Sequence, residues 1–100
     1  MKGTLIRYKA AADRAEENQQ LIENVFAELH QKRPDGVRYM VLRLADGTFV
    51  HFVARSPDRT SAITDLGAFK TFQQGIKERT VEAPQSNEAT LVGNYGMLRD

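Results

Sequence analysis

Two histidines are the side chains of this protein that titrate closest to neutral pH. His51 falls in the middle of an apolar run, 48–54, where burial shifts a pKa and a bound substrate would find a general base. The alternative is a histidine that is hydrogen-bonded in the core or an interface and has no catalytic task. His30 falls near the polar end of a predicted helix, where a solvated or dipole-related role is expected. His51 is therefore the candidate catalytic residue.

A second group of residues has side chains of the types that line small-molecule pockets. Three tyrosines fall on three predicted strands, and converging phenols would orient or deprotonate an aromatic substrate. One arginine interrupts an apolar strand and would suit a substrate carboxylate, although an interface salt bridge explains it equally. Two phenylalanines face inward at helical spacing and either wall a pocket or belong to the core. The candidate ligand-binding residues are Tyr8, Tyr39, Arg43, Phe69, Phe72 and Tyr95.

The composition argues against several classes of function. The 100 residues contain no cysteine, which excludes disulfides, thiol catalysis and sulfur-ligated metals, and the two histidines lack metal-ligand spacing. The net charge is +1 with scattered basic residues, so no nucleic-acid partner is expected. The segment 93–96 lacks the spacing of a phosphate-binding loop, and no cofactor is predicted. No segment has the apolar length of a signal peptide or a membrane span, so a cytoplasmic protein without membrane contact is expected.

The pattern of elements indicates one domain spanning 1–100. A strand is predicted over 4–9, and a helix follows with Asp13 as its N-cap and the turn 34–36 after its end. Strands are predicted over 37–44 and 48–54, a second helix from Leu66 to about Thr80, a connector over 81–88 and a last strand over 89–98. This β-α-β-β-α-β order is typical of a ferredoxin-like α+β fold with a four-stranded antiparallel sheet and both helices on one face.

The two central strands are predicted to form a hairpin around Asp46-Gly47, a strong signal for a two-residue turn. That turn would pair Leu44 with Phe49 and Leu42 with His51, and a three-residue loop would break this register. It would also place Tyr39 and Arg43 on the side of the sheet opposite His51.

Every predicted strand carries apolar residues on both faces, yet two helices cover only one face of a sheet. Roughly eight apolar groups on the open face would stabilise a complex by at most about 10–25 kcal/mol. Association costs about 4–15 kcal/mol, so burial of this face can exceed that cost. A homodimer packed sheet against sheet is therefore predicted.

The stretch from the third strand into the second helix carries a family resemblance. It comprises Thr48-Phe-Val-His-Phe-Val-Ala54 and Leu66-Gly-Ala-Phe-Lys-Thr-Phe-Gln-Gln-Gly-Ile76. These resemble the aromatic strand and the F-x-x-F-type helix of the antibiotic biosynthesis monooxygenase-like superfamily, whose members are dimeric α+β barrels, and the likeness in element order spans nearly the whole chain.

The resemblance implies a homodimer with a pocket between sheet and helices in each subunit. In active members it implies oxygenation of aromatic or polyketide-like compounds without a cofactor. The family's frequent Glu-x-Trp falls here near Val53 and Arg55, and the chain contains no tryptophan, unlike haem-degrading relatives. Two functions thus remain open: a small-molecule pocket protein of monooxygenase type with His51 as base or orienter, or a non-catalytic homodimeric ligand-binding or structural module.

Overall fold

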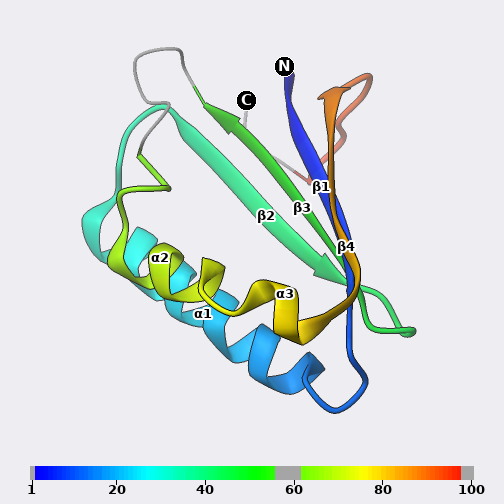
Figure 1. Ribbon diagram of the computed structural model, residues 1–100. Helices are drawn as coiled ribbons and strands as arrows, with labels where there is room; N and C mark the ends of the chain where they lie inside the picture. The colour runs from blue at the N-terminus through cyan, green and yellow to red at the C-terminus, as the bar shows by residue number, and fades with distance from the viewer. Residues whose placement is uncertain (1, 56–61, 98–100) are drawn as a thin grey trace.

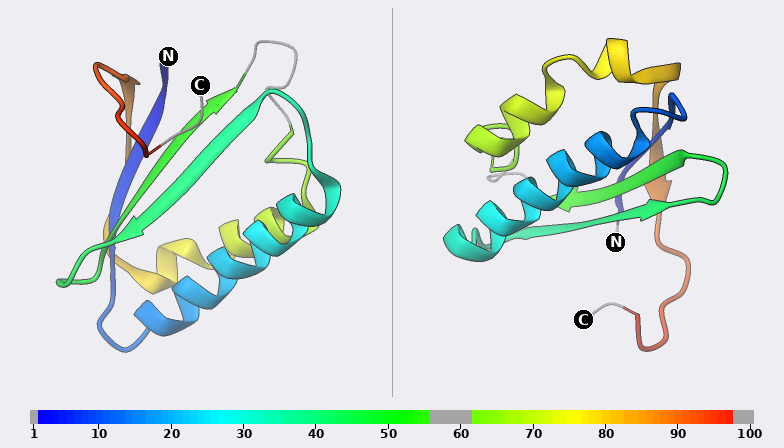
Figure 2. Two further views of the ribbon diagram at one scale, coloured as in Figure 1. Left: turned by 180° about the vertical axis from the view of Figure 1, so that it is seen from behind. Right: turned by 90° about the horizontal axis from the view of Figure 1, so that it is seen from below.

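The computed structural model describes residues 2–55 and 62–97 (Figure 1). The elements, in chain order, are β1 (Lys2–Ala10), α1 (Ala15–Lys32), β2 (Val37–Arg43), β3 (Thr48–Arg55), α2 (Gly67–Gln73), α3 (Ile76–Arg79) and β4 (Thr80–Thr90). The strands form one sheet in the order β2-β3-β1-β4, and all three neighbouring pairs are antiparallel. The helices lie on one side of this sheet (Figure 2). The predicted ferredoxin-like α+β fold is confirmed.

The core fills the space between the helices and the sheet. Residues of β1 and β3 that point toward the helices pack against the apolar stripe of α1 and against α2. Tyr8 and Phe49, on neighbouring strands, stack with 5.6 Å between ring centroids. The buried members of this cluster are Tyr8, Ala10, Ala15, Ile22, Val25, Phe49, Leu66 and Phe72.

Helix α1 starts and ends by different means. Arg14, not the predicted Asp13, occupies the N-cap position, and no side chain caps the helix there. At the other end Arg33 adopts a left-handed conformation with φ of 47°, and its N–H donates to the Leu29 carbonyl, ahead of Pro34. The end predicted from the turn 34–36 is confirmed.

The single second helix that the sequence predicted is two helices. Gly75 has φ of 74°, a conformation that glycine adopts without strain, and it separates α2 from α3. The first turn of α2 has no side-chain cap of its own. Glu28 of α1 fills that role, because its carboxylate accepts a hydrogen bond of 2.9 Å from the Ala68 N–H.

The hairpin register predicted from Asp46-Gly47 is wrong by one residue. The loop has three residues, 45–47, because Leu44 pairs with Thr48 through a hydrogen bond of 2.8 Å and Gly47 takes the left-handed position with φ of 88°. Tyr39, Val41 and Arg43 therefore oppose Val53, His51 and Phe49, respectively. A one-residue shift moves every side chain of a strand to the other face, so Tyr39 lies on the helix side with His51.

The last strand also differs from the prediction. The strand pairs with β1 over Thr80–Thr90, most of which was expected to be a connector, and 91–97 continue beyond it without strand structure. β4 lies at the edge of the sheet, where Pro84 and a polar composition are tolerated because one side needs no ladder partner. The prediction that every strand brings apolar residues to the open face fails here, since Gln85 and Asn87 pair with the open-face residues Arg7 and Leu5.

The face of the sheet without helices remains apolar over its other half. Met40 and Leu42 of β2 and Leu44 directly after it are 37%, 53% and 44% exposed, and Val50 and Phe52 of β3 are half-buried beside them. The segment after β4 runs out on the same side of the sheet (Figure 2) and exposes Val92, Tyr95 and Met97. Among the described helices, none is long and apolar enough to cross a membrane.

Candidate functional site

A pocket of about 530 Å³ opens between the sheet and helices α2 and α3. This volume falls within the range of small-molecule sites. Its walls are mostly apolar, and the described residues that line it include no lysine, arginine, aspartate or glutamate. The lining residues are Thr4, Ile6, Tyr8, Tyr39, His51, Val53, Ile63, Thr64, Phe69, Phe72, Gln73, Ile76, Pro84 and Ser86.

His51 occupies the sheet wall of this pocket, between two phenols. Its Nε2 lies 2.8 Å from the Tyr8 hydroxyl and its Nδ1 lies 2.7 Å from the Tyr39 hydroxyl. The three residues come from β3, β1 and β2, and the register places Tyr8 and Tyr39 diagonally across from His51 on the same face of the sheet. The ring of Phe26 stacks on Tyr39 with 4.9 Å between centroids, which holds that phenol in position.

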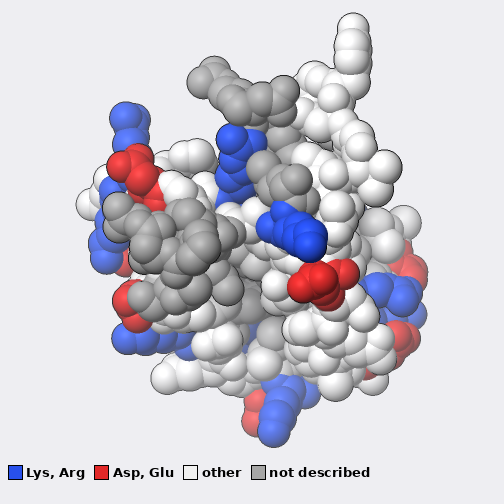
Figure 3. All heavy atoms as spheres, turned by 90° about the horizontal axis from the view of Figure 1, so that it is seen from above, with Lys and Arg blue, Asp and Glu red and all other residues white. Residues whose placement is uncertain are grey.

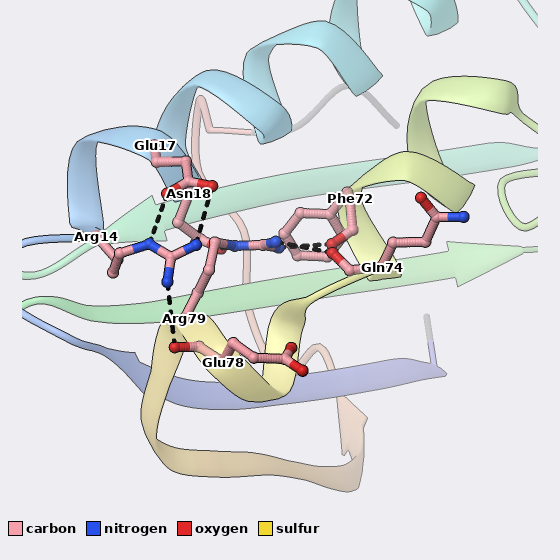
Figure 4. A network of polar contacts seen from close by, with 7 residues as sticks. All are labelled: Arg14, Glu17, Asn18, Phe72, Gln74, Glu78 and Arg79. Atoms are coloured by element: carbon pink, nitrogen blue, oxygen red, sulfur yellow. Dashed lines mark hydrogen bonds and ion pairs between the residues drawn. The ribbon is translucent and has the colours of Figure 1, made fainter.

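The hydrogen-bond chain continues from Tyr8 away from the pocket. The Asn18 side-chain amide of α1 donates to the Tyr8 hydroxyl at 2.9 Å, and Arg79 Nε donates to Asn18 Oδ1 at 3.1 Å. The guanidinium of Arg79 also donates to the carbonyl oxygens of Phe72 and Gln74 (Figure 4). A continuous chain thus runs from Arg79 through Asn18, Tyr8 and His51 to Tyr39.

Burial sets the protonation states along this chain. It lowers the pKa of His51 to about 4, so the imidazole is neutral at physiological pH. It raises the pKa of Tyr8 to about 12, against a smaller opposing effect of the Asn18 hydrogen bond, and it raises the pKa of Tyr39 as well. Burial also lowers the pKa of Arg79, which nevertheless stays cationic because a guanidinium starts so high. The pocket therefore presents neutral hydrogen-bonding groups.

Five of the seven residues predicted for the site meet at this pocket. They are Tyr8, Tyr39, His51, Phe69 and Phe72. Arg43 lies outside it and donates hydrogen bonds of 2.8 and 2.7 Å to Glu16 and Gln19 of α1. Tyr95 lies outside it as well, 98% exposed in the segment after β4. A carboxylate clamp at Arg43 therefore has no support within one subunit.

Sequence reasoning missed Asn18 and Arg79. Both are buried, at 0% and 2% exposure, and both occupy core positions of their helices. Asn18 stands between Ala15 and Ile22 on the buried stripe of α1, and Arg79 continues the spacing of Phe69, Phe72 and Ile76. A polar residue at a position where helical spacing expects an apolar one was the signal that would have identified them.

The depressed pKa of His51 makes stability depend on pH in a defined window. Between the unfolded value of 6.5 and the folded value of about 4, the unfolded chain binds the proton and the folded chain does not. The contribution of His51 to the free energy of unfolding is therefore present above pH 6.5 and lost as the pH falls toward 4. It amounts to roughly 3 kcal/mol. Chemical denaturation at several pH values is expected to show this fall, and a His51→Gln variant should lack that share of the slope. An equal slope in both proteins would contradict the assignment.

Within the described residues, neither the face shown in Figure 3 nor the arrangement of possible metal ligands points to a second site. On the face shown in Figure 3, basic and acidic side chains lie interspersed, with no concentration of one sign. Across 2–55 and 62–97, no group of three or more His, Cys, Asp or Glu side chains is arranged to hold a metal ion. The apolar pocket is the site that the geometry supports.

Comparison with known proteins identifies the fold. No family model and no curated protein matches the sequence. Solved structures provisionally named antibiotic biosynthesis monooxygenases do match: one from Bacteroides thetaiotaomicron with a TM-score of 0.75, 12% identity and coverage of 99% of this chain and 96% of its own. One from Caulobacter crescentus has a TM-score of 0.73 and 19% identity, and the match covers 92% of this chain and 90% of that one. One from Nitrosomonas europaea has a TM-score of 0.73 and 14% identity, and the match covers 91% of this chain and 89% of that one. This chain therefore has the α+β fold of the antibiotic biosynthesis monooxygenase-like proteins, as its third strand and second helix indicated.

Proposed function

We propose that this protein binds a largely apolar small molecule in the pocket between its sheet and its helices. The observation that carries the proposal is the wall of this pocket: apolar side chains surround one neutral, hydrogen-bonded group of Tyr8, His51 and Tyr39. Such a pocket takes up an uncharged aromatic or polyketide-like compound through burial and orients it through few polar contacts. The cytoplasm is the proposed compartment.

Blocking the pocket tests this proposal. Ile76 lines it from α3, whereas the neighbouring Lys77 is exposed and lies outside the lining. With 2-acetylnaphthalene as the probe, calorimetry is expected to show binding that Ile76→Trp weakens at least tenfold and Lys77→Trp leaves unchanged. Binding that survives in Ile76→Trp would place the ligand elsewhere.

An enzymatic form of this function is oxygenation without a cofactor; the names of the structural neighbours refer to monooxygenases. An activated methylene compound supplies the electrons itself: its methylene group and one dioxygen molecule give one carbonyl group and one water, so the balance needs no further reductant. In this reaction His51 would accept and return a proton, and the two neutral phenols would orient the substrate. The oxygen uptake of anthrone solutions, with and without protein, distinguishes turnover from binding alone. An uptake unaffected by Ile76→Trp would not come from this pocket.

We also propose a homodimer in which the open sheet faces of two copies pack together. Met40, Leu42, Leu44 and Phe52 supply a contiguous apolar surface, and the segment 91–97 adds exposed apolar residues on the same side. An exposed patch of this kind is unusual for a monomer. Native mass spectrometry over a concentration series is expected to show a dimer and would detect any ligand that copurifies. A monomer at every concentration would refute the assembly.

The non-catalytic alternative shares the pocket and the dimer. One observation favours it: both ring nitrogens of His51 are already hydrogen-bonded to phenols, which describes an orienting group better than a free base. Under this alternative, probes bind in the pocket and no oxygen is consumed.

A further inference from the structure

We propose that Arg79, acting through Asn18 and Tyr8, fixes His51 as the Nδ1–H tautomer, so that Tyr39 directs its hydroxyl hydrogen into the pocket and selects ligands that carry an oxygen acceptor. The first part of the proposal, the tautomer of His51, concerns the protein alone. The selection of an acceptor rests on the proposed function, because it requires that a ligand occupies the pocket.

Arg79 determines the orientation of the Asn18 side-chain amide. Arg79 has only donors, and its Nε lies 3.1 Å from the Asn18 side chain. The amide oxygen of Asn18 must therefore face Arg79, since the opposite orientation would bring two donors together. The amide N–H of Asn18 then faces Tyr8 and donates to its hydroxyl oxygen at 2.9 Å.

The orientation of Asn18 decides where the Tyr8 hydroxyl hydrogen points. With Asn18 as the donor to its oxygen, the Tyr8 hydroxyl has one other described partner, His51 Nε2 at 2.8 Å. Tyr8 is only 2% exposed, so if Nε2 carried a hydrogen, the Tyr8 oxygen would accept two hydrogen bonds and its own hydrogen would have neither a described acceptor nor solvent, which is a costly arrangement. Tyr8 therefore donates to Nε2, and Nε2 is unprotonated.

The tautomer of His51 decides where the Tyr39 hydroxyl hydrogen points. A neutral imidazole with an unprotonated Nε2 carries its hydrogen on Nδ1, which lies 2.7 Å from the Tyr39 oxygen. Nδ1–H donates to that oxygen, so the Tyr39 hydrogen is left to point elsewhere. Tyr39 lines the pocket, and its hydrogen is available to a ligand there.

The chain determines what kind of ligand fits. Every hydrogen bond in it points from the Arg79 cation toward Tyr39, and bonds aligned in one direction strengthen one another. Since no charged residue is among the described lining residues, the complementary ligand is an uncharged, mostly apolar molecule with a carbonyl or similar oxygen at the Tyr39 hydroxyl.

The tautomer is measured directly by long-range ¹H–¹⁵N NMR of the His51 ring in the intact protein. The expected spectrum has a protonated Nδ1 and an unprotonated Nε2. A protonated Nε2 in the wild-type protein would overturn the proposal without any variant or ligand.

Asn18→Asp tests whether Asn18 sets the direction of the chain. A carboxylate only accepts, so one oxygen takes the Arg79 donor and the other takes the Tyr8 hydrogen. Nε2–H then donates to Tyr8, Tyr39 donates to Nδ1, and the tautomer reverses. Asn24→Asp adds the same charge at an exposed position of the same helix and should leave the wild-type tautomer. A folded Asn18→Asp protein that keeps Nδ1–H would overturn the proposal.

Matched probes test the ligand part. Tyr39→Phe is expected to weaken 2-acetylnaphthalene binding about tenfold, as the loss of one hydrogen bond predicts. It should not affect 2-isopropenylnaphthalene, which has the same shape without the oxygen. Equal effects on both probes would overturn acceptor selection. If neither probe enters the wild-type pocket, the proposed function fails and acceptor selection fails with it, while the tautomer spectra still decide the first part.

Discussion

Replacing Arg79 with methionine is expected to lower the free energy of unfolding by about 3–5 kcal/mol, because the variant keeps an unbranched apolar stem but loses every donor. Three acceptors would be left without this partner: Asn18 Oδ1 and the carbonyl oxygens of Phe72 and Gln74 at the end of α2. The guanidinium also lies over the Phe72 ring, 5.4 Å from its centroid, and that contact with the pocket wall disappears as well. Urea unfolding followed by circular dichroism measures the change.

The control for this variant is Arg14→Met. Arg14 is half-exposed, and its guanidinium forms a surface ion pair with Glu17 at 2.6 Å beside the same network (Figure 4). Exposed ion pairs contribute little, so its loss should hardly change stability. Arg79→Lys should fall between the two, because an ammonium keeps the charge but reaches fewer of the acceptors. Equal stability of the Arg79→Met and Arg14→Met proteins would show that the buried arginine does not hold this part of the fold together.

Leu42→Glu is expected to weaken the proposed homodimer by at least about 100-fold, which corresponds to about 2.7 kcal/mol. Leu42 is 53% exposed near the middle of the apolar surface of β2 and β3. In a two-fold interface the substitution occurs twice, and burying an unpaired carboxylate costs several kcal/mol. Sedimentation equilibrium measures the dissociation constant.

Ala27→Glu provides the matched control, because Ala27 is exposed on α1, on the helix side of the sheet. It adds the same charge away from the proposed interface and should leave the dimer intact. A Leu42→Glu protein that still dimerises as tightly as the wild type would place the interface on another surface.

Element order and fold class could be predicted because hydrophobic spacing changes clearly between the strands and the helices. The hairpin register could not, although Asp46-Gly47 marks the turn correctly. Both a two-residue and a three-residue loop suit that dipeptide, and here the Asp46 carboxylate accepts the Thr48 N–H at 2.9 Å, which supports the longer loop. This difference of one residue decides whether Tyr39 joins His51 or lies on the opposite face.

The last strand was misplaced because its residues have little intrinsic preference for strands. The segment 82–88 contains proline, serine and asparagine, and pairing with β1 overrides these local tendencies. The predicted strand 89–98 was more apolar, yet Val92, Tyr95 and Met97 are exposed. Tertiary pairing of this kind leaves no periodic signal in a single sequence.

The candidate site was predicted in part for a similar reason. Aromatic residues and a central histidine identify themselves by type, and Tyr8, His51 and Phe72 do meet at the pocket. Asn18 and Arg79 act through contacts between α1 and the end of α3, 61 positions apart in sequence. Only the folded structure shows that two polar residues on apolar stripes satisfy one another.

The isoleucine methyl groups allow the most direct test of the central claim, that the pocket between sheet and helices binds an apolar small molecule. Of the four isoleucines in the chain, Ile6, Ile63 and Ile76 line this pocket, whereas Ile22 is buried on α1 outside it. In a protein labelled with ¹³C at these methyls, 2-acetylnaphthalene is expected to shift the three pocket signals in a saturable manner and leave Ile22 unchanged. Pocket signals that do not move at the solubility limit of the probe, or a response confined to Ile22, would contradict the account.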